Sequence, residues 1–172
     1  MTNSCGPRLI PPLYTPEQRR RRDASRWTMV QGVLAPLQFL VFAVSLALVV
    51  TFMVTGDYFE AATTSVVLKT LVLYTIMVTG AIWEKVVFGQ YLFAPAFYWE
   101  DVVSMLVIAL HTAYLAAWYF DLASQQSQML LALAAYTSYV VNATQFLLKL
   151  RRARLQADSR LHPPLMAGMA GL

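Results

Sequence analysis

The segment from residue 83 to residue 101, WEKVVFGQYLFAPAFYWED, combines seven aromatic residues with four charged ones. The charged residues are Glu84, Lys85, Glu100 and Asp101. Carboxyl groups beside aromatic rings can exchange protons with a large flat ligand that the rings hold. Aromatic residues also gather at membrane surfaces as an interfacial belt, and the segment lies between two long apolar runs. Two interpretations stand: a membrane-surface belt, or a ligand site whose rings include Trp83, Tyr91, Phe97 and Trp99.

A second polar group continues from Glu100 along one face of the next apolar block. Ser104 follows Glu100 by four residues and His111 follows Ser104 by seven, spacings that return to the same side of an α-helix. His111 then lies about 16 Å deeper than Glu100, near the middle of a bilayer. An imidazole there can ligate a metal, relay a proton or hydrogen-bond a neighbouring helix. This face is the strongest candidate for chemistry.

Three further polar residues stand inside apolar blocks, where burial in a bilayer is costly. Asn142 and Gln145 share one side of the last block, and amides facing a bundle interior commonly hydrogen-bond across helices. Alternatively, together with Ser104, they bind polar substituents of a ligand. Lys69 lies only about eight residues into its block, so we expect its amine to extend toward the nearby membrane surface; the alternative is a functional role inside the bundle.

The elements that must position these residues are membrane-spanning helices. The chain has 172 residues, of which 58% are hydrophobic and 13% charged, far from the average of a soluble domain. Four apolar blocks, at about 33–55, 62–82, 102–120 and 129–149, each approach the ~20 residues that a helix needs to cross a bilayer. We therefore predict an all-α bundle of four transmembrane helices over residues 30–155, between an N-terminal segment, 1–29, and a flexible tail, 156–172.

The basic residues predict the orientation of this bundle. Arginines precede the first block at Arg19 to Arg22 and Arg26, and others follow the last at Arg151, Arg152 and Arg154. Because basic residues collect on the cytoplasmic side, both termini should be cytoplasmic. The connection at 83–101 then faces the cytoplasm too.

Composition and motifs exclude several classes of protein. The net charge of +4 comes from bases at the two membrane-flanking ends, which favours anionic lipid over nucleic acid as a partner. Cys5 is the only cysteine, so one chain cannot form a disulfide or a cysteine metal site. His162 lies in the tail and cannot join His111 as a haem ligand. Nucleotide-binding, zinc-protease and serine-hydrolase motifs are lacking, and we expect no cofactor.

Longer stretches of the chain resemble a known family. LYTPEQRRRRDAS, VQGVLAPLQFLVF, KTLVLYTIMVTGAIWEKVVFGQYLFAPAFYWEDVVSMLVIALHTAYL and NATQFLLKL closely resemble the 2-vinyl bacteriochlorophyllide hydratase family, from about Leu13 to Leu155. The resemblance implies hydration of the vinyl group of a chlorophyllide or bacteriochlorophyllide to a 1-hydroxyethyl group, in bacteriochlorophyll synthesis. It also implies a bacterial inner membrane, cytoplasmic or intracytoplasmic, and other enzymes of that synthesis as partners. A homo-oligomer is compatible with so small a bundle.

Adding water to a vinyl group needs a proton for the terminal carbon and a base for the attacking water. One of Glu84, Glu100 and Asp101, kept protonated by an apolar setting or by a like-charged neighbour, is the hypothetical general acid, and another carboxylate orients the water. Glu100 is the first choice as the acid because it shares the face of His111. His111 would donate a proton or bind the magnesium of the substrate, and Lys85 would pair with its propionate. The alternative class is a pigment-binding or assembly protein without catalysis, or a small transporter.

Overall fold

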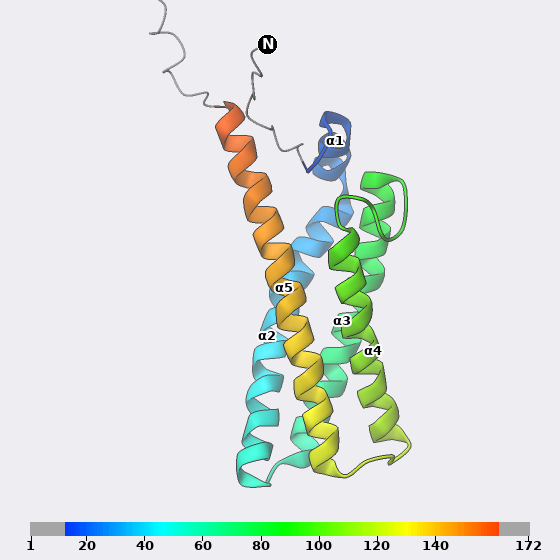
Figure 1. Ribbon diagram of the computed structural model, residues 1–172, viewed down its shortest axis with the longest axis vertical. Coiled ribbons are helices and arrows are strands. Elements are labelled where there is room, and N and C mark those ends of the chain that lie inside the picture. The colour runs from blue at the N-terminus through cyan, green and yellow to red at the C-terminus, as the bar shows by residue number, and fades with distance from the viewer. Residues whose placement is uncertain (1–12, 162–172) are drawn as a thin grey trace, which may run out of the picture.

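The computed structural model describes residues 13–161, with side chains described as far as Leu155, and it is entirely helical over that range apart from its turns and connections (Figure 1). The helices are α1 (Pro16–Ala24), α2 (Arg26–Thr55), α3 (Phe59–Phe88), α4 (Tyr98–Tyr119) and α5 (Gln125–Leu161). The last four are long and apolar enough to cross a membrane, as the four predicted spans would be, and α1 is an additional fifth helix. Cys5 and His162, on which two exclusions depended, lie outside the described residues.

The short helix α1 was not predicted, because it lies in the polar N-terminal segment and has no apolar periodicity. Local chemistry starts it: Thr15 and Gln18 form a reciprocal capping box, and Pro16 occupies the first turn. Arg21 and Arg22 lie in its last turn, where cations are favourable. Ser25 ends α1 and its side chain caps the first turn of α2, so the two helices follow each other directly.

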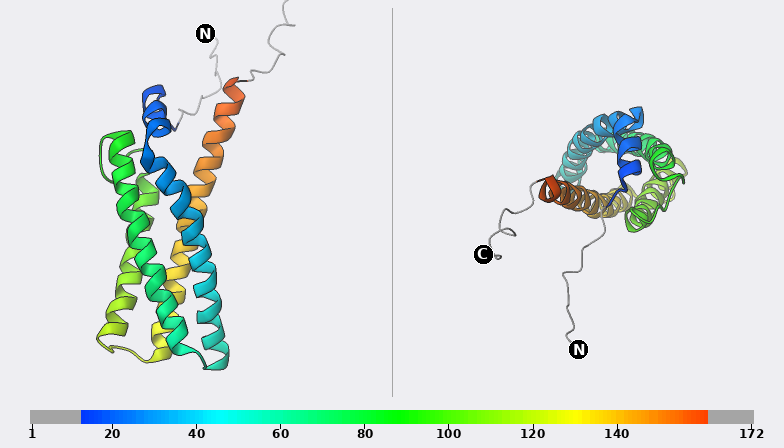
Figure 2. Two further views of the ribbon diagram at one scale, coloured as in Figure 1. Left: turned by 180° about the vertical axis from the view of Figure 1, so that it is seen from behind. Right: turned by 90° about the horizontal axis from the view of Figure 1, so that it is seen from above.

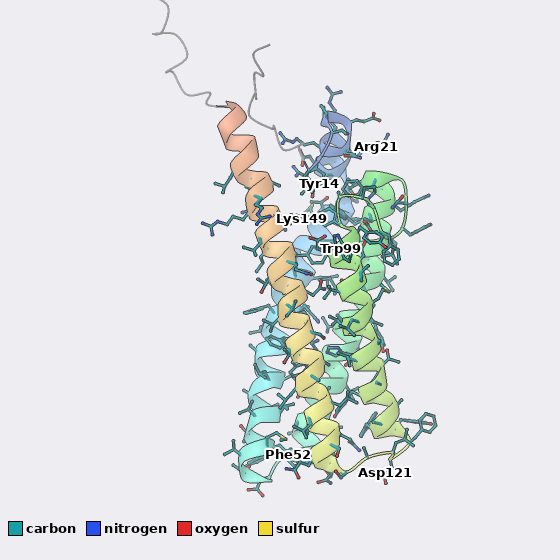
Figure 3. The ribbon with its side chains drawn as sticks, viewed as in Figure 1. Tyr14, Arg21, Phe52, Trp99, Asp121 and Lys149 are labelled. Carbon is teal, nitrogen blue, oxygen red and sulfur yellow. The ribbon has the colours of Figure 1, made fainter. Side chains whose placement is uncertain are left out.

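The four long helices form an up-and-down bundle in which each contacts the helix before and after it, and α5 closes the ring against α2. Figure 2 shows this ring along the bundle axis. The helices pair as two hairpins, α2 with α3 and α4 with α5, and contacts between the hairpins are sparser. Figure 3 places Tyr14, Arg21, Trp99 and Lys149 toward one end, here called the α1 end, and Phe52 and Asp121 at the other.

The connection between α3 and α4 is shorter than predicted. α3 runs to Phe88 and α4 begins at Tyr98, so only residues 89–97 lie between helices. Hydropathy placed the end of the block at the first charge, but a helix can continue past a charge whose side chain turns inward, as that of Glu84 does. Gly89 ends α3 with φ 90°, a left-handed conformation that other residues rarely adopt, and its N–H bonds to Lys85 O. This cap turns the chain back over the α1 end.

α2 bends along its length, as both side views show (Figures 1 and 2). Pro36 lies inside the helix and has no N–H to donate to the preceding turn, the usual cause of such a bend. Toward the α1 end, α2 and α5 therefore diverge. The apolar core lies mainly between this bend and the end of the bundle opposite α1. Its most buried members include Val49, Val66, Val107 and Tyr136.

Candidate active site

Two acidic side chains from different hairpins meet at the α1 end. Glu84 is 4% exposed near the end of α3 and Asp101 is 6% exposed in the first turn of α4. The connection between the helices holds both: Phe93 N–H donates to Asp101 Oδ2 at 2.7 Å and Ala94 N–H to Glu84 Oε1 at 3.1 Å. The donors are adjacent residues of one short connection, which brings the two carboxyl groups close to each other. Two adjacent carboxylates repel, so such a pair favours a state in which one of the carboxyl groups holds a proton.

Glu100, next to this carboxyl pair, has a different partner. Its Oε2 lies 2.5 Å from Lys149 Nζ, in an ion pair that joins α4 to α5. The same ammonium donates to Ala96 O at 2.5 Å and lies 5.1 Å from the ring centroid of Phe97. The acid cluster, defined as Glu84, Glu100 and Asp101, thus contains two neighbouring carboxyl groups and an ion-paired carboxylate. Lys149 was not recognised in the sequence, where it was one more base near the end of the last block.

The aromatic residues of 83–101 separate into an inner and an outer group. Phe97 is buried and packs with Tyr14, Trp83, Phe88 and Phe146, with centroids 5.7–6.4 Å apart. Trp83 Nε1 donates to Thr28 Oγ1 at 3.0 Å, which links α3 to α2. These rings join the N-terminal segment to the bundle end. Burial raises the pKa of the Tyr14 hydroxyl, so this ring stays uncharged beneath the guanidinium of Arg22.

The outer group is exposed at the surface. Trp99 is 70% exposed and its ring lies 5.6 Å from that of Tyr98, which in turn lies 5.8 Å from that of Phe93. We call these three residues the aromatic strip. Tyr91 is exposed as well, and Lys85 lies 5.3 Å from its ring centroid while donating to Gly89 O at 2.7 Å. Phe93, whose N–H binds Asp101, connects the strip to the acid cluster.

The polar face predicted on α4 points into the bundle, since Glu100, Ser104 and His111 are all buried. Ser104 accepts a hydrogen bond of 2.8 Å from Asn142 Nδ2, which joins α4 to α5. His111 Nδ1 lies 2.7 Å from Val107 O, and its Nε2 lies 2.5 Å from Lys69 Nζ. Both ring nitrogens therefore have protein partners, and a magnesium ion at Nε2 would have to displace Lys69.

Lys69 corrects one prediction. Its side chain was expected to extend to the membrane surface, but it is fully buried between the helices. The amine meets His111 and lies 4.3 Å from the ring centroid of Tyr139, so it gains a nitrogen partner and an aromatic face in place of water. The periodicity of α3 placed Lys69 on the face of Leu73, and Leu73 is itself buried.

These features define a multi-pass α-helical membrane protein with a buried acid cluster at one end. A family model described as 2-vinyl bacteriochlorophyllide hydratase matches residues 14–152. The 2-vinyl bacteriochlorophyllide hydratase of Rhodobacter capsulatus is 69% identical over 147 residues, which cover 86% of this chain and 85% of the relative. That of Cereibacter sphaeroides is 67% identical over 147 residues, 86% of this chain and 91% of the relative. No solved structure matches the chain. The chain belongs to the 2-vinyl bacteriochlorophyllide hydratase family, as the sequence resemblance predicted.

Proposed function

We propose that this protein is a hydro-lyase that adds water to the vinyl group of a bacteriochlorophyllide and leaves a 1-hydroxyethyl group. The names of the relatives support this function, and one structural observation supports the chemistry: two neighbouring buried carboxyl groups lie beside an ion-paired carboxylate. Hydration needs both an acid and a base. The acid cluster offers one of each within a single chain.

The two kinds of carboxyl group suit the two halves of the reaction. The Glu84–Asp101 pair gives its proton to the terminal vinyl carbon, and the macrocycle spreads the positive charge that forms on the inner carbon. Water attacks that carbon, forms the C–O bond and releases a proton to Glu100, which is ion-paired with Lys149. Transfer of this proton back to Asp101 restores the starting state. Glu100, the first choice as the acid on sequence grounds, thereby becomes the base.

The function is tested by incubating membranes that contain the protein with a 3-vinyl bacteriochlorophyllide and measuring the mass of the pigment. We expect a gain of one water, and we expect the hydrated product to lose water slowly in the same membranes, because both directions share a transition state. Matched membranes without the protein are the control. A pigment that binds to the membranes and keeps its mass would indicate the non-catalytic pigment-binding protein instead.

We propose that the pigment reaches the acid cluster along the aromatic strip. A chlorin has flat apolar faces, and the strip exposes three rings next to the loop that holds Asp101. Trp99→Ala should raise KM about fivefold to tenfold and leave kcat nearly unchanged, since one stacking contact contributes about 1 kcal/mol. Trp118→Ala, which removes an exposed tryptophan near the opposite end of α4, should change neither constant. An unaltered KM for Trp99→Ala would exclude this route.

We propose further that both termini and the acid cluster face the cytoplasm, in the inner or intracytoplasmic membrane of a bacterium. The arginines of α1 and those at Arg151, Arg152 and Arg154 lie at the α1 end, together with the acid cluster. Gln90→Cys in a Cys5→Ser background should react with a membrane-impermeant thiol reagent in inverted vesicles and be protected in intact cells. The opposite pattern would reverse the topology. Other enzymes and second copies are not needed to complete the cluster, since one chain supplies all its members.

A further inference from the structure

Three amide side chains lie between the acid cluster and the Lys69–His111 contact. Gln38 on α2 is 2% exposed, Asn142 on α5 is 8% exposed, and the amide oxygen of Gln145 on α5 is buried as well. We call these residues the amide layer. Among the described residues, no hydrogen-bond partner exists for Oε1 or Nε2 of Gln38, for Oδ1 of Asn142 or for Oε1 of Gln145. Four amide atoms in one part of the bundle thus have no partner within the described part of the chain.

Contacts of residues one turn away define the height of the amide layer along the bundle. Gln38 is one turn from Phe42 and Asn142 is one turn from Tyr139, and the rings of Phe42 and Tyr139 pack 4.9 Å apart. Since α2 and α5 are antiparallel, both amides lie on the same side of that contact, toward the α1 end. Gln145 is one turn before Lys149, the partner of Glu100. The amide layer therefore lies about one turn from Glu100, the proposed base in the acid cluster.

Burying an amide without hydrogen-bond partners at this depth carries a large free-energy cost. Each unmet donor or acceptor in a bilayer interior costs several kcal/mol, and neither lipid nor the apolar core can supply a partner. Buried amides in native proteins meet this need with ordered water, which makes about three hydrogen bonds in a polar site. Water is also the second substrate of a hydratase, and it must reach the cluster without passing through the pigment.

We propose that the amide layer is a water-binding chamber that supplies the water added to the vinyl group. The inference rests on the proposed function and deepens it: the pigment approaches from the aromatic strip, and water approaches from inside the bundle. Gln38, Asn142 and Gln145 are positioning residues, which hold the water so that one O–H points at Glu100 and the oxygen faces the vinyl carbon. The proton released in attack goes to Glu100, as above.

The presence of water is tested by thiol reactivity without pigment. In a Cys5→Ser background, Asn142→Cys should react with a small hydrophilic methanethiosulfonate at least about tenfold faster than two controls, because only the thiolate reacts and it forms only in contact with water. The controls are Val49→Cys, in the fully buried apolar core, and Val141→Cys, on the lipid-facing side of α5. Gln38→Cys, which places the thiol on α2 rather than α5, should also react at least about tenfold faster than the two controls. If Asn142→Cys and Gln38→Cys both react as slowly as Val49→Cys, the amide layer does not hold water and the proposal is wrong.

The supply of water to the reaction is tested separately by kinetics. Gln38→Leu keeps the size of the side chain and removes both amide atoms, so kcat should fall at least about tenfold while KM for the pigment stays within twofold. Unchanged kcat would overturn the supply role. The two tests also separate this inference from the proposed function: an unreactive layer in an active hydratase removes the chamber alone, and a reactive layer in a chain that never hydrates pigment removes the hydratase proposal.

Discussion

Glu84→Gln is expected to lower kcat for hydration by about 10²- to 10⁴-fold, the usual contribution of a general acid. Glutamine is the same size and its oxygen can still accept the hydrogen bond from Ala94 N–H, so the connection should keep its shape. The variant has no acidic proton at this position, so the first step loses the donor proposed for it. The measurement is the initial rate of water addition in membranes at equal protein content, with KM determined alongside. Glu60→Gln, at the far end of α3, is the matched control and should behave as the wild type.

The carboxyl pair should act as a unit. If both members hold a single catalytic proton, Glu84→Gln combined with Asp101→Asn should be about as slow as the slower single variant, because removing one member already removes the function. Losses that multiply would instead assign independent roles to the two residues. Wild-type rates in both single variants would eliminate the pair as the acid.

Lys149→Met is expected to lower the free energy of unfolding by about 3 kcal/mol, since the substitution leaves Glu100 buried and charged without its cation. It also removes the hydrogen bond to Ala96 O, which lies in the connection that covers the acid cluster. The measurement is the unfolding midpoint of the purified protein in detergent. Lys85→Met is the control: that lysine is exposed and its bond to Gly89 O faces solvent, so the midpoint should barely move.

A second substitution separates stability from activity. Adding Glu100→Gln to Lys149→Met removes the unpaired charge, so the midpoint should recover most of its loss. Hydration should remain slow, because the base is gone. If Lys149→Met alone unfolds at the wild-type midpoint, the ion pair contributes little. If the double variant hydrates pigment at the wild-type rate, Glu100 is not the base.

The fold followed from the sequence to a large extent, because hydropathy and helical periodicity report burial directly. The four spans were predicted, and so was the inward face of α4 that carries Glu100, Ser104 and His111. Span ends were less accurate. Glu84 lies on the last turns of a helix, although its charge suggested a connection. Hydropathy measures the apolar run, whereas a helix ends where a cap such as Gly89 stops its hydrogen bonds.

The pairings within the site did not follow from the sequence. Lys149 and Glu100 are 49 residues apart, and Lys69 and His111 are 42 apart. Which residues meet across two helices depends on their relative height and rotation, and a single sequence does not specify either. The separation of the aromatic residues into an inner and an outer group could not be predicted for the same reason. Phe97 and Trp99 are two positions apart, yet Phe97 is buried and Trp99 is largely exposed.

The division of the bundle into two hairpins bears on how the protein is made. Glu84 and Lys69 belong to the first hairpin, while Asp101 and His111 belong to the second. Each hairpin can enter the bilayer as it leaves the ribosome, but the two carboxyl groups become neighbours only after the hairpins have docked. Before docking, the two acids are apart from each other. On the proposed mechanism, docking of the two hairpins is therefore the step that makes the protein active.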